Sequence, residues 1–239
     1  MTILITGIAG SLGKAFTKLL QDEHNLIGYD NNEWSVAEFQ REFPKVKVLL
    51  EDFSEWKFDQ DPVDLVIHCG AYKHLSLGEE NPNAFIDNNI IKTRKLFAEA
   101  FKNNADILFI SSDKAVEPCN LYGYTKAIGE CLAKEYEGYI ARCGNFLNSS
   151  GSVIPVWEKA LKENKPIPIT DIDMKRFVIE VDDAARQIWT GYNQGHKLII
   201  PDCKEVNITS LMPKGAEFEI IGIRPGEKMR EKLRWDCES

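Results

Sequence analysis

Short apolar runs alternate with amphipathic segments over the first 145 residues, and this pattern restricts the fold more than any other feature of the sequence. Each apolar run is too short for a buried helix and shows little polar alternation. The runs lie at residues 3–6, 26–29, 46–50, 63–69, 107–111 and 139–142, and helical segments at 15–20, 33–43, 83–103 and 123–135. Such strands are typical of a parallel sheet covered by helices on both faces. We therefore expect an α/β fold with a doubly wound parallel sheet.

The character of the sequence changes after residue 145. Glycine, serine and proline become frequent, and the expected elements become short and mixed. We therefore predict two parts, a first domain of residues 1–145 and a smaller substrate-binding region of residues 146–239. The second part is expected to pack partly back on the first.

Composition excludes several classes of protein. The 239 residues are 44% hydrophobic, enough for a sizeable core, and the net charge of −8 argues against a nucleic-acid or anionic-membrane partner. No apolar run approaches the roughly 20 residues that span a bilayer, and the start MTILITG leads directly into a strand without a secretion signal.

Six cysteines without a CxxC pair predict reduced thiols in a cytoplasmic protein. His68 and His74 lack a third ligand, so we expect no metal site.

A glycine-rich loop follows the first expected strand. Gly7, Gly10 and Gly13 have GxxGxxG spacing, and Ser11 and Leu12 would begin the following helix. Glycines allow a tight turn and close approach to a pyrophosphate, which a helix N-terminus stabilises. The loop therefore indicates a Rossmann-type domain that binds NAD or NADP, although a plain tight turn would use the same residues.

Asp30 ends the second expected strand, where a carboxylate can bind the ribose hydroxyls of the adenosine. A carboxylate there would repel the extra phosphate of NADP, so Asp30 favours NAD. The alternative is an Asp that caps a helix in a turn with Asn31 and Asn32. We also assign three further residues to the cofactor site: Asp52, which follows the third strand near the expected adenine, Phe53 and Ala71.

The stretch 109–126 contains two tyrosines and two lysines. Tyr122 and Lys126 are one helical turn apart and share a face, so the ammonium is expected to lower the pKa of the phenol and make it a usable base. Tyr124 lacks this spacing. Ser112 lies ten residues upstream of Tyr122 at the end of a strand, which completes the Ser–Tyr–Lys set of short-chain dehydrogenases. The alternative is a pair of solvated helix residues.

Lys114 needs a separate explanation. It follows Asp113 at the carboxyl end of the fifth strand, where ligands bind in this architecture. The two residues could be a simple surface pair. Hydride transfer requires only the Ser–Tyr–Lys set, however, so an additional acid and base suggest a further proton-transfer step.

Five ordered segments carry a resemblance that spans nearly the whole chain. They are GAYKHLSLGEENP (70–82), SSDKAVEPCNLYGYTK (111–126), ARCGNFLNSSGSVIP (141–155), PITDIDMKRFVIEVDDA (168–184) and IGIRPGEKMREKL (221–233). With them the chain resembles the extended short-chain dehydrogenase/reductases, and within these the inverting UDP-N-acetylglucosamine 4,6-dehydratases of polysaccharide biosynthesis. Retaining sugar dehydratases have an Asp-Glu pair where this chain has Asp113 and Lys114.

The resemblance implies a mechanism. Tyr122, helped by Lys126, would take the proton of the C4 hydroxyl while C4 hydride passes to the nicotinamide. Lys114 would then remove the C5 proton, and Asp113 would protonate the departing C6 hydroxyl. The hydride returns to C6, and C5 is reprotonated from the opposite face. A lysine base must be partly neutral, and we expect a neighbouring cation, Lys126 or Lys73, to favour that form.

The resemblance also implies a site for a UDP-sugar, whose diphosphate requires cations. Asn89 would help hold the active-site backbone, and a homo-oligomer is expected. The expected substrate residues are Lys73, His74, Asn145, Arg176, Arg224 and Glu227, with Lys228 as a further cation. Each has a structural alternative, such as a turn at Arg224 or a solvated loop residue at Lys73.

Three other functions remain open. A UDP-sugar 4-epimerase or a 5,6-dehydratase would use the same fold and cofactor, and the fate of the C6 hydroxyl separates them from a 4,6-dehydratase. A non-catalytic NAD(P)-binding protein is the third. Such proteins often lose the catalytic Tyr or Lys, and this chain retains Tyr122 and Lys126.

Overall fold

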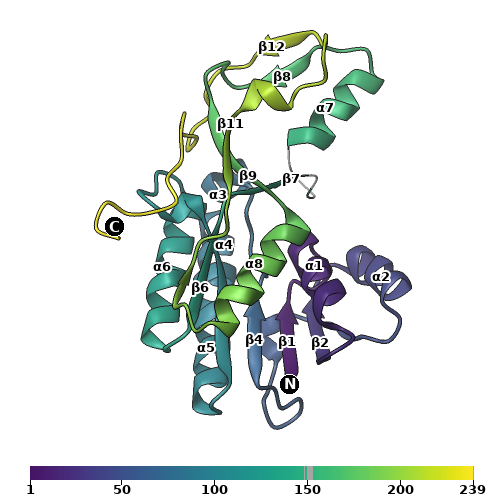
Figure 1. The fold of residues 1–239 in the computed structure, drawn as a ribbon, viewed down its shortest axis with the longest axis vertical. Helices are drawn as coiled ribbons and strands as arrows, with labels where there is room; N and C mark the ends of the chain where they lie inside the picture. Colours follow the sequence, from purple (N-terminus) through teal and green to yellow (C-terminus); the bar gives the residue numbers. More distant parts are fainter. Residues whose placement is uncertain (148, 150–152, 239) are drawn as a thin grey trace.

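The computed structural model describes residues 1–147, 149 and 153–238 of the 239-residue chain. Residues 148 and 150–152, part of the third segment of resemblance, lie outside the described residues. The described chain has two parts. The lower part in Figure 1 is a sheet between two layers of helices, and the upper part is a smaller assembly of short strands and one helix.

The main sheet has seven strands in the order β10-β6-β5-β4-β1-β2-β3, and every neighbouring pair is parallel. This confirms the predicted Rossmann-type doubly wound sheet. The strands are β1 (Thr2–Thr6), β2 (Asn25–Asp30), β3 (Lys47–Leu50), β4 (Leu65–His68), β5 (Asp106–Ser112), β6 (Tyr139–Cys143) and β10 (Leu198–Ile199).

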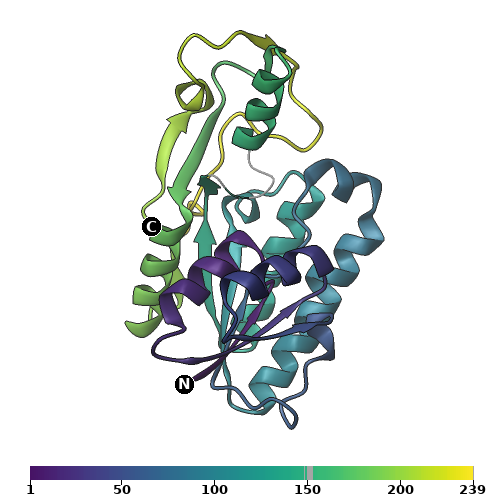
Figure 2. The same cartoon turned by 90° about the vertical axis from the view of Figure 1, so that its right-hand side faces the viewer.

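Helices cover both faces of this sheet because its strands are apolar on both sides. Ile3 and Ile5 of β1 belong to a core with α1 (Ser11–Leu20), α2 (Glu33–Glu42) and α8 (Val181–Asn193). Leu4, between them, faces the opposite core with α5 (Thr93–Lys102) and α6 (Leu121–Glu135). Successive strand residues point to opposite faces, so one continuous apolar run supplies both cores. Figure 2 shows α1 and α2 together on one side of the sheet.

The helix predicted at 83–103 is interrupted by a wider turn. It consists of α4 (Pro82–Ile86), a π-helical segment, η2 (Asp87–Lys92), and α5. The extra residue per turn directs two buried side chains, Asn88 and Asn89, toward the active-site side. Asn89 binds both backbone groups of Tyr72, at 2.9 Å from its nitrogen and 2.8 Å from its oxygen. It therefore holds this loop, as expected.

After residue 145 the chain leaves the main sheet and returns to it. Helix α8 packs against α1, and β10 adds the seventh strand, so the expectation of only short elements in this region was wrong for α8. Two small sheets have the orders β11-β9-β7 and β12-β8. Their strands are β7 (Asn145–Leu147), β8 (Ile167–Ile169), β9 (Lys175–Glu180), β11 (Lys204–Asn207) and β12 (Phe218–Ile220). The remaining elements are α3 (Leu75–Glu80), α7 (Val153–Lys162), η1 (Phe53–Glu55), η3 (Asp113–Ala115) and η4 (Ile208–Leu211).

The C-terminal segment runs back from the upper part and ends beside α6 (Figure 1). It is fastened by Arg142, a fully buried arginine of β6. The guanidinium binds both oxygens of Glu130 on α6, at 2.9 and 2.6 Å, and both oxygens of Glu238, at 2.6 and 3.1 Å. Bidentate geometry on both sides satisfies a charge that would be very costly to bury alone.

This network predicts unequal costs for removing two paired arginines. Arg142→Met leaves the Glu130 carboxylate buried without a counter-ion, and we expect the free energy of unfolding to fall by about 3–5 kcal/mol. Arg186→Met is the matched control, because Arg186 pairs with Asp183 on the exposed surface of α8 and its loss should cost about 1 kcal/mol or less. Urea denaturation of both variants measures the difference. Equal losses would contradict the role given to Arg142.

Candidate active site

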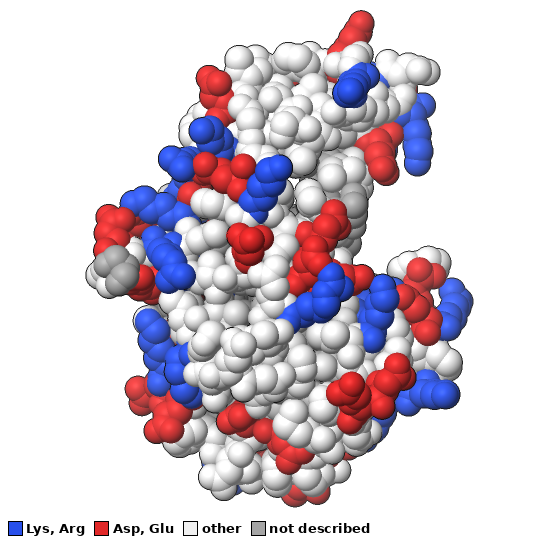
Figure 3. All heavy atoms as spheres, viewed as in Figure 1, with Lys and Arg blue, Asp and Glu red and all other residues white. Residues whose placement is uncertain are grey.

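A cavity of about 830 Å³ lies at the carboxyl edge of the main sheet, beneath the smaller upper part. The molecule is hollowed between its two parts in Figure 3, and acidic and basic side chains lie close together on that face. The cavity is lined by the ends of β1, β2, β4, β5 and β6 and by the C-terminal segment. Ligands of doubly wound sheets bind in this place because the strand order reverses beside β1.

The glycine loop forms one wall of the cavity. Gly7, with φ +63°, passes Gly70 so closely that a Cβ on Gly7 would lie 2.9 Å from the Gly70 backbone. Gly10, Ser11 and Leu12 line the cavity where α1 begins, and the start of a helix favours an anion. Gly13 lies under the loop instead, where a Cβ would come within 2.4 Å of the Gly7 carbonyl oxygen. Its role is therefore close packing of the helix on the loop.

Asp30 lines the cavity at the end of β2. Its carboxylate accepts hydrogen bonds from the backbone nitrogens of Ala9, at 3.2 Å, and Asn32, at 3.0 Å. The residue that caps α2 is Asn32, whose Oδ1 accepts from Ser35 N at 2.9 Å, so the capping alternative for Asp30 does not hold. Burial raises the pKa of the Asp30 carboxyl, although the two backbone hydrogen bonds act in the opposite direction.

The other expected cofactor residues divide into two groups. Phe53 and Ala71 line the cavity. Asp52 is not among the lining residues: its carboxylate accepts from Ser54 N at 3.0 Å and from Lys92 Nζ at 2.7 Å. Burial is the largest single influence and would raise the pKa of the Asp52 carboxyl, but the hydrogen bonds with Lys92 and Ser54 and the charge of Lys92 together outweigh it, and the pKa is lowered.

The Ser–Tyr–Lys set is assembled at the start of α6. Asn120 caps this helix through a 2.7 Å hydrogen bond to Gly123 N, and the Tyr122 hydroxyl is hydrogen-bonded to the side chain of Ser112. Ser112, Tyr122 and Lys126 all line the cavity, whereas the side chain of Tyr124 is exposed.

The predicted effect of Lys126 on the phenol was wrong for this structure. Burial raises the pKa of the Tyr122 hydroxyl, the hydrogen bond with Ser112 partly offsets this, and the charge of Asp113 adds to the rise. Lys126 is not among the groups that shift this pKa, and its Nζ donates to the carbonyl of Ile110 at 2.8 Å. Burial lowers the pKa of the Lys126 ammonium itself to about 8.

Asp113 and Lys114 form a largely buried ion pair rather than a surface pair. The side chain of Asp113 is 1% exposed and that of Lys114 is 14% exposed, with 3.0 Å between Oδ1 and Nζ. Ser112 Oγ also donates to Asp113 Oδ1 at 2.9 Å. Lys114 lines the cavity and reaches Asn145 Oδ1 at 3.5 Å.

Two carboxylates lie next to Lys114. Besides Asp113, the buried side chain of Glu231 lies 3.8 Å from Lys114 Nζ. Glu231 belongs to the matched segment 221–233, but sequence spacing does not show that this segment packs beside η3.

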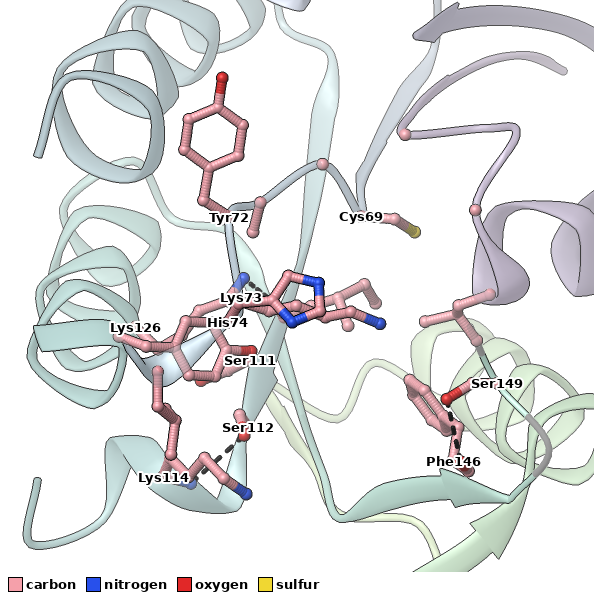
Figure 4. Close-up of a pocket in the computed structure, with 18 of the residues that line it drawn as sticks. Cys69, Tyr72, Lys73, His74, Ser111, Ser112, Lys114, Lys126, Phe146 and Ser149 are labelled. Atoms are coloured by element: carbon pink, nitrogen blue, oxygen red, sulfur yellow. Dashed lines mark hydrogen bonds between the residues drawn. The ribbon is translucent and has the colours of Figure 1, made fainter. Parts of the chain in front are cut away.

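All six residues expected to bind the substrate line the cavity: Lys73, His74, Asn145, Arg176, Arg224 and Glu227. In Figure 4, Ser112, Lys114 and Lys126 lie on one side of the view, Phe146 and Ser149 lie on the other, and His74 projects between them. Burial lowers the pKa of Lys73.

The sequence analysis missed several lining residues. They include Glu231, Ser149, Cys69, Cys143, Tyr72, Glu79 and Phe146. Glu231 lay within the segment IGIRPGEKMREKL, so the resemblance contained a signal for it, but no role followed from spacing alone. Glu79 could not be found by any local pattern, because it reaches the site from α3 to accept a hydrogen bond from Leu121 N at 2.8 Å.

Membrane-spanning helices and metal-binding clusters are both absent from the described ranges 1–147, 149 and 153–238. No helix there is both long enough and apolar enough to cross a membrane. The same residues contain no group of three or more His, Cys, Asp or Glu side chains that could hold a metal ion.

The fold and the site define an extended short-chain dehydrogenase/reductase. The model of the polysaccharide biosynthesis protein family matches residues 3–239, and the chain belongs to that family. It is 33% identical to an uncharacterized membrane protein of Methanocaldococcus jannaschii, over 97% of this chain and 80% of that one. It is also 33% identical to the inverting UDP-N-acetylglucosamine 4,6-dehydratase of Campylobacter jejuni, over 96% and 76%. A UDP-glucose 4-epimerase of Rickettsia canadensis is 28% identical over 97% and 77%.

Solved structures agree on the fold. The X-ray structure of Pen from Bacillus thuringiensis has a TM-score of 0.87 and 28% identity, covering 97% of this chain and 82% of that chain. DesIV, a dTDP-glucose 4,6-dehydratase from Streptomyces venezuelae solved with NAD and TYD bound, has a TM-score of 0.82 and 20% identity over 98% and 88%. Together with the curated relatives, these matches identify an enzyme that modifies nucleotide sugars.

The shifted pKa of Lys126 predicts a pH dependence of stability. The folded pKa is about 8 and the ordinary value is 10.5, so the unfolded chain binds more protons between these values. The free energy of unfolding should therefore rise with pH across this window, by at most about 1.4 kcal/mol per pH unit. Lys126→Met should lack this contribution, and urea unfolding of both proteins across the window measures it. Parallel pH curves would contradict the shift.

Proposed function

We propose that this protein is a nucleotide-sugar 4,6-dehydratase that acts on UDP-N-acetylglucosamine, or a close UDP-sugar, and inverts C5. The observation that carries the proposal is the buried Asp113–Lys114 pair beside Ser112 and Tyr122. It adds a buried carboxyl group and a lysine that lines the cavity to a site that needs neither for hydride transfer alone. The similarity to the Campylobacter dehydratase supports the same reaction.

The residues of the first domain fit a dinucleotide. The loop around Gly7 and Gly10 would hold the pyrophosphate at the start of α1, and Asp30 would bind the ribose hydroxyls. NAD or NADP supplies, when bound, the acceptance and return of a hydride. The Asp30 carboxylate favours NAD because it would repel the additional phosphate of NADP, and the related structure of DesIV contains NAD.

Tyr122 is the proposed base for the C4 hydroxyl. Its hydroxyl is hydrogen-bonded to Ser112, which would also hold the C4 oxygen. Since burial raises the pKa of Tyr122, proton transfer from the sugar depends on contacts formed with bound ligands. Lys126 has its pKa lowered to about 8 by burial, so this amine can exchange a proton near neutral pH, and its Nζ lies over the ring of Phe109, 4.6 Å from the ring centre.

Lys114 and Asp113 are the proposed groups for dehydration. A ketone at C4 makes the C5 proton acidic, and the Lys114 amine would take that proton. Asp113 would donate a proton to the departing C6 hydroxyl, so that water leaves. One Asp113 oxygen binds Ser112 and Lys114, and the other, Oδ2, has no hydrogen-bond partner among the described residues. Asp113 is not among the residues that line the cavity, so donation of a proton to the sugar requires Oδ2 to be uncovered when the substrate binds.

The upper part would bind the nucleotide end of the substrate. On this proposal residues 146–239 form the substrate-binding region, and α8 and β10 belong structurally to the Rossmann sheet. Arg176 and Arg224 bring positive charge to the cavity of a protein with a net charge of −8. A diphosphate is the natural ligand of such arginines, because a guanidinium can bind two phosphate oxygens.

A homo-oligomer is part of the proposal. Ile91 of η2, Phe101 of α5 and Ile128 of α6 are 53%, 47% and 43% exposed. Their helices are neighbours on one face of the main sheet. Exposed apolar side chains on adjoining helices favour a contact with a second copy.

A 4-epimerase is the second candidate, supported by the similarity to UDP-glucose 4-epimerases. An epimerase needs the tyrosine base but gives Lys114 and Asp113 no chemical task. A 5,6-dehydratase would use the pair but not return the hydride to C6. A non-catalytic NAD(P)-binding protein would turn over no nucleotide sugar.

The proposal is tested in deuterated water with UDP-N-acetylglucosamine and NAD. The wild-type protein should remove one water and introduce deuterium at C5 with inverted configuration, as seen by mass spectrometry and NMR. In Lys114→Met, water loss and deuterium entry at C5 should both slow by about 10²–10⁴-fold, while C4 oxidation continues. In Tyr122→Phe, C4 oxidation, water loss and deuterium entry should all be lost.

Each other outcome selects another function. C4 inversion without water loss would establish an epimerase, and a 5,6-alkene with the hydride returned to C4 rather than to C6 would establish a 5,6-dehydratase. Binding of NAD without turnover of any nucleotide sugar would establish the non-catalytic alternative. Retained water loss in Lys114→Met would contradict the role of Lys114.

The cofactor preference gives a separate prediction. Asp30→Asn keeps the size of the side chain but removes its charge, so affinity for NAD should fall and the discrimination against NADP should shrink. Titration of both cofactors by calorimetry measures this without any substrate. Asp52→Asn is the matched control, because Asp52 pairs with Lys92 away from the cavity lining and should change neither affinity strongly. Unchanged discrimination in Asp30→Asn would contradict the assignment.

A further inference from the structure

The C-terminal segment brings a carboxylate to the catalytic lysine. Glu231 lies more than a hundred positions after Lys114 in the sequence, yet its side chain is only 2% exposed and lines the same cavity. Its Oε1 is 3.8 Å from Lys114 Nζ, and its Oε2 is 3.5 Å from Lys228 Nζ. Lys114 therefore lies between two buried carboxylates, Asp113 on one side and Glu231 on the other.

Stability alone does not account for Glu231. A buried carboxylate is costly unless hydrogen bonds satisfy its oxygens. Oε2 of Glu231 is buried and has no hydrogen-bond partner among the described residues. Lys228 makes its short contact elsewhere, donating from Nζ to the Val116 carbonyl at 2.9 Å. A carboxylate held in this unfavourable state beside a cavity indicates a task in the cavity.

The backbone of the C-terminal segment is well fixed, so the position of Glu231 is determined. Asn120 donates from Nδ2 to the Gly226 carbonyl at 2.7 Å, while its Oδ1 caps the helix that carries Tyr122. Arg230, next to Glu231, binds Glu205 of β11 through two hydrogen bonds on the outer side. The segment also carries Arg224 and Glu227, so one stretch of chain connects the proposed nucleotide contacts to Lys114.

We infer that Glu231 is a positioning residue for Lys114: its buried carboxylate, 3.8 Å from Nζ, holds the lysine side chain in place for the C5 proton of the sugar. This inference rests on the proposed dehydratase function and adds a residue to which that function assigned no part.

The test separates C4 oxidation from C5 proton transfer. Glu231→Gln keeps the shape of the side chain but removes the negative charge beside Lys114. In deuterated water with UDP-N-acetylglucosamine and NAD, we expect deuterium entry at C5 to slow by roughly 10²-fold, because a misplaced or protonated base loses about that much. C4 oxidation, followed in a single turnover by absorbance of the reduced cofactor, should be retained. Glu231→Asp keeps the charge but shortens the side chain, so its rate of deuterium entry at C5 should lie between those of the wild type and Glu231→Gln.

Arg230→Gln is the matched control. It removes an anchor of the same segment on the outer side of the chain and leaves the carboxylate near Lys114, so it should not separate the two rates. Equal slowing of both steps in Glu231→Gln, or a selective loss of C5 exchange in Arg230→Gln, would overturn the inference in favour of a structural role. If Glu231→Gln does not fold, a selective loss of C5 exchange in Glu231→Asp supports the inference, and unchanged exchange overturns it.

Failure of the proposed function would give a different experimental result. If the wild-type protein neither oxidises C4 nor exchanges C5, the dehydratase proposal fails and this inference fails with it. If the wild-type protein exchanges C5 and Glu231→Gln does so at the same rate, only the role of Glu231 is overturned.

Discussion

The parallel register of β1, β4, β5 and β6 is the constraint from which the site follows. Because these strands run in one direction, the segments that leave them meet at one edge of the sheet. The turn after β1 passes Gly70, which follows β4, with no space for a side chain on Gly7. Ser112 ends β5, and its hydroxyl contacts that of Tyr122, which comes from the neighbouring helix α6. A single shift of register would turn alternate strand residues to the wrong face and separate these groups.

The C-terminal segment converts this open edge into an enclosed site. Asn120 joins the two parts, since one end of its amide caps α6 and the other binds the Gly226 carbonyl. Arg142 fastens the far end of the segment through Glu238 and fastens α6 through Glu130. The catalytic helix and the proposed substrate-binding segment are therefore held by common residues, and a change in one is expected to reach the other.

Local patterns predicted the parts of the site that are local. The glycine loop, the one-turn spacing of Tyr122 and Lys126 and the strand end at Ser112 all follow from neighbouring residues, and the structure brings them together. Two further points depend on the three-dimensional structure: Asn32 caps α2, which leaves Asp30 to the cavity, and the Lys126 ammonium donates to the Ile110 carbonyl. Glu231 required knowledge of long-range packing, which spacing does not encode. The wider turn of η2 was likewise hidden in an ordinary helical pattern.

A crystal structure with UDP-N-acetylglucosamine and NAD bound would test the central claim, that Lys114 is the base for C5, most directly. The account predicts that Lys114 Nζ lies about 3–3.5 Å from C5, the separation of reacting atoms before transfer, with the C4 hydroxyl against Tyr122 and the diphosphate against the arginines of the upper part. A sugar whose C5 hydrogen points away from Lys114, with Lys114 bound only to Asp113 and Glu231, would contradict it.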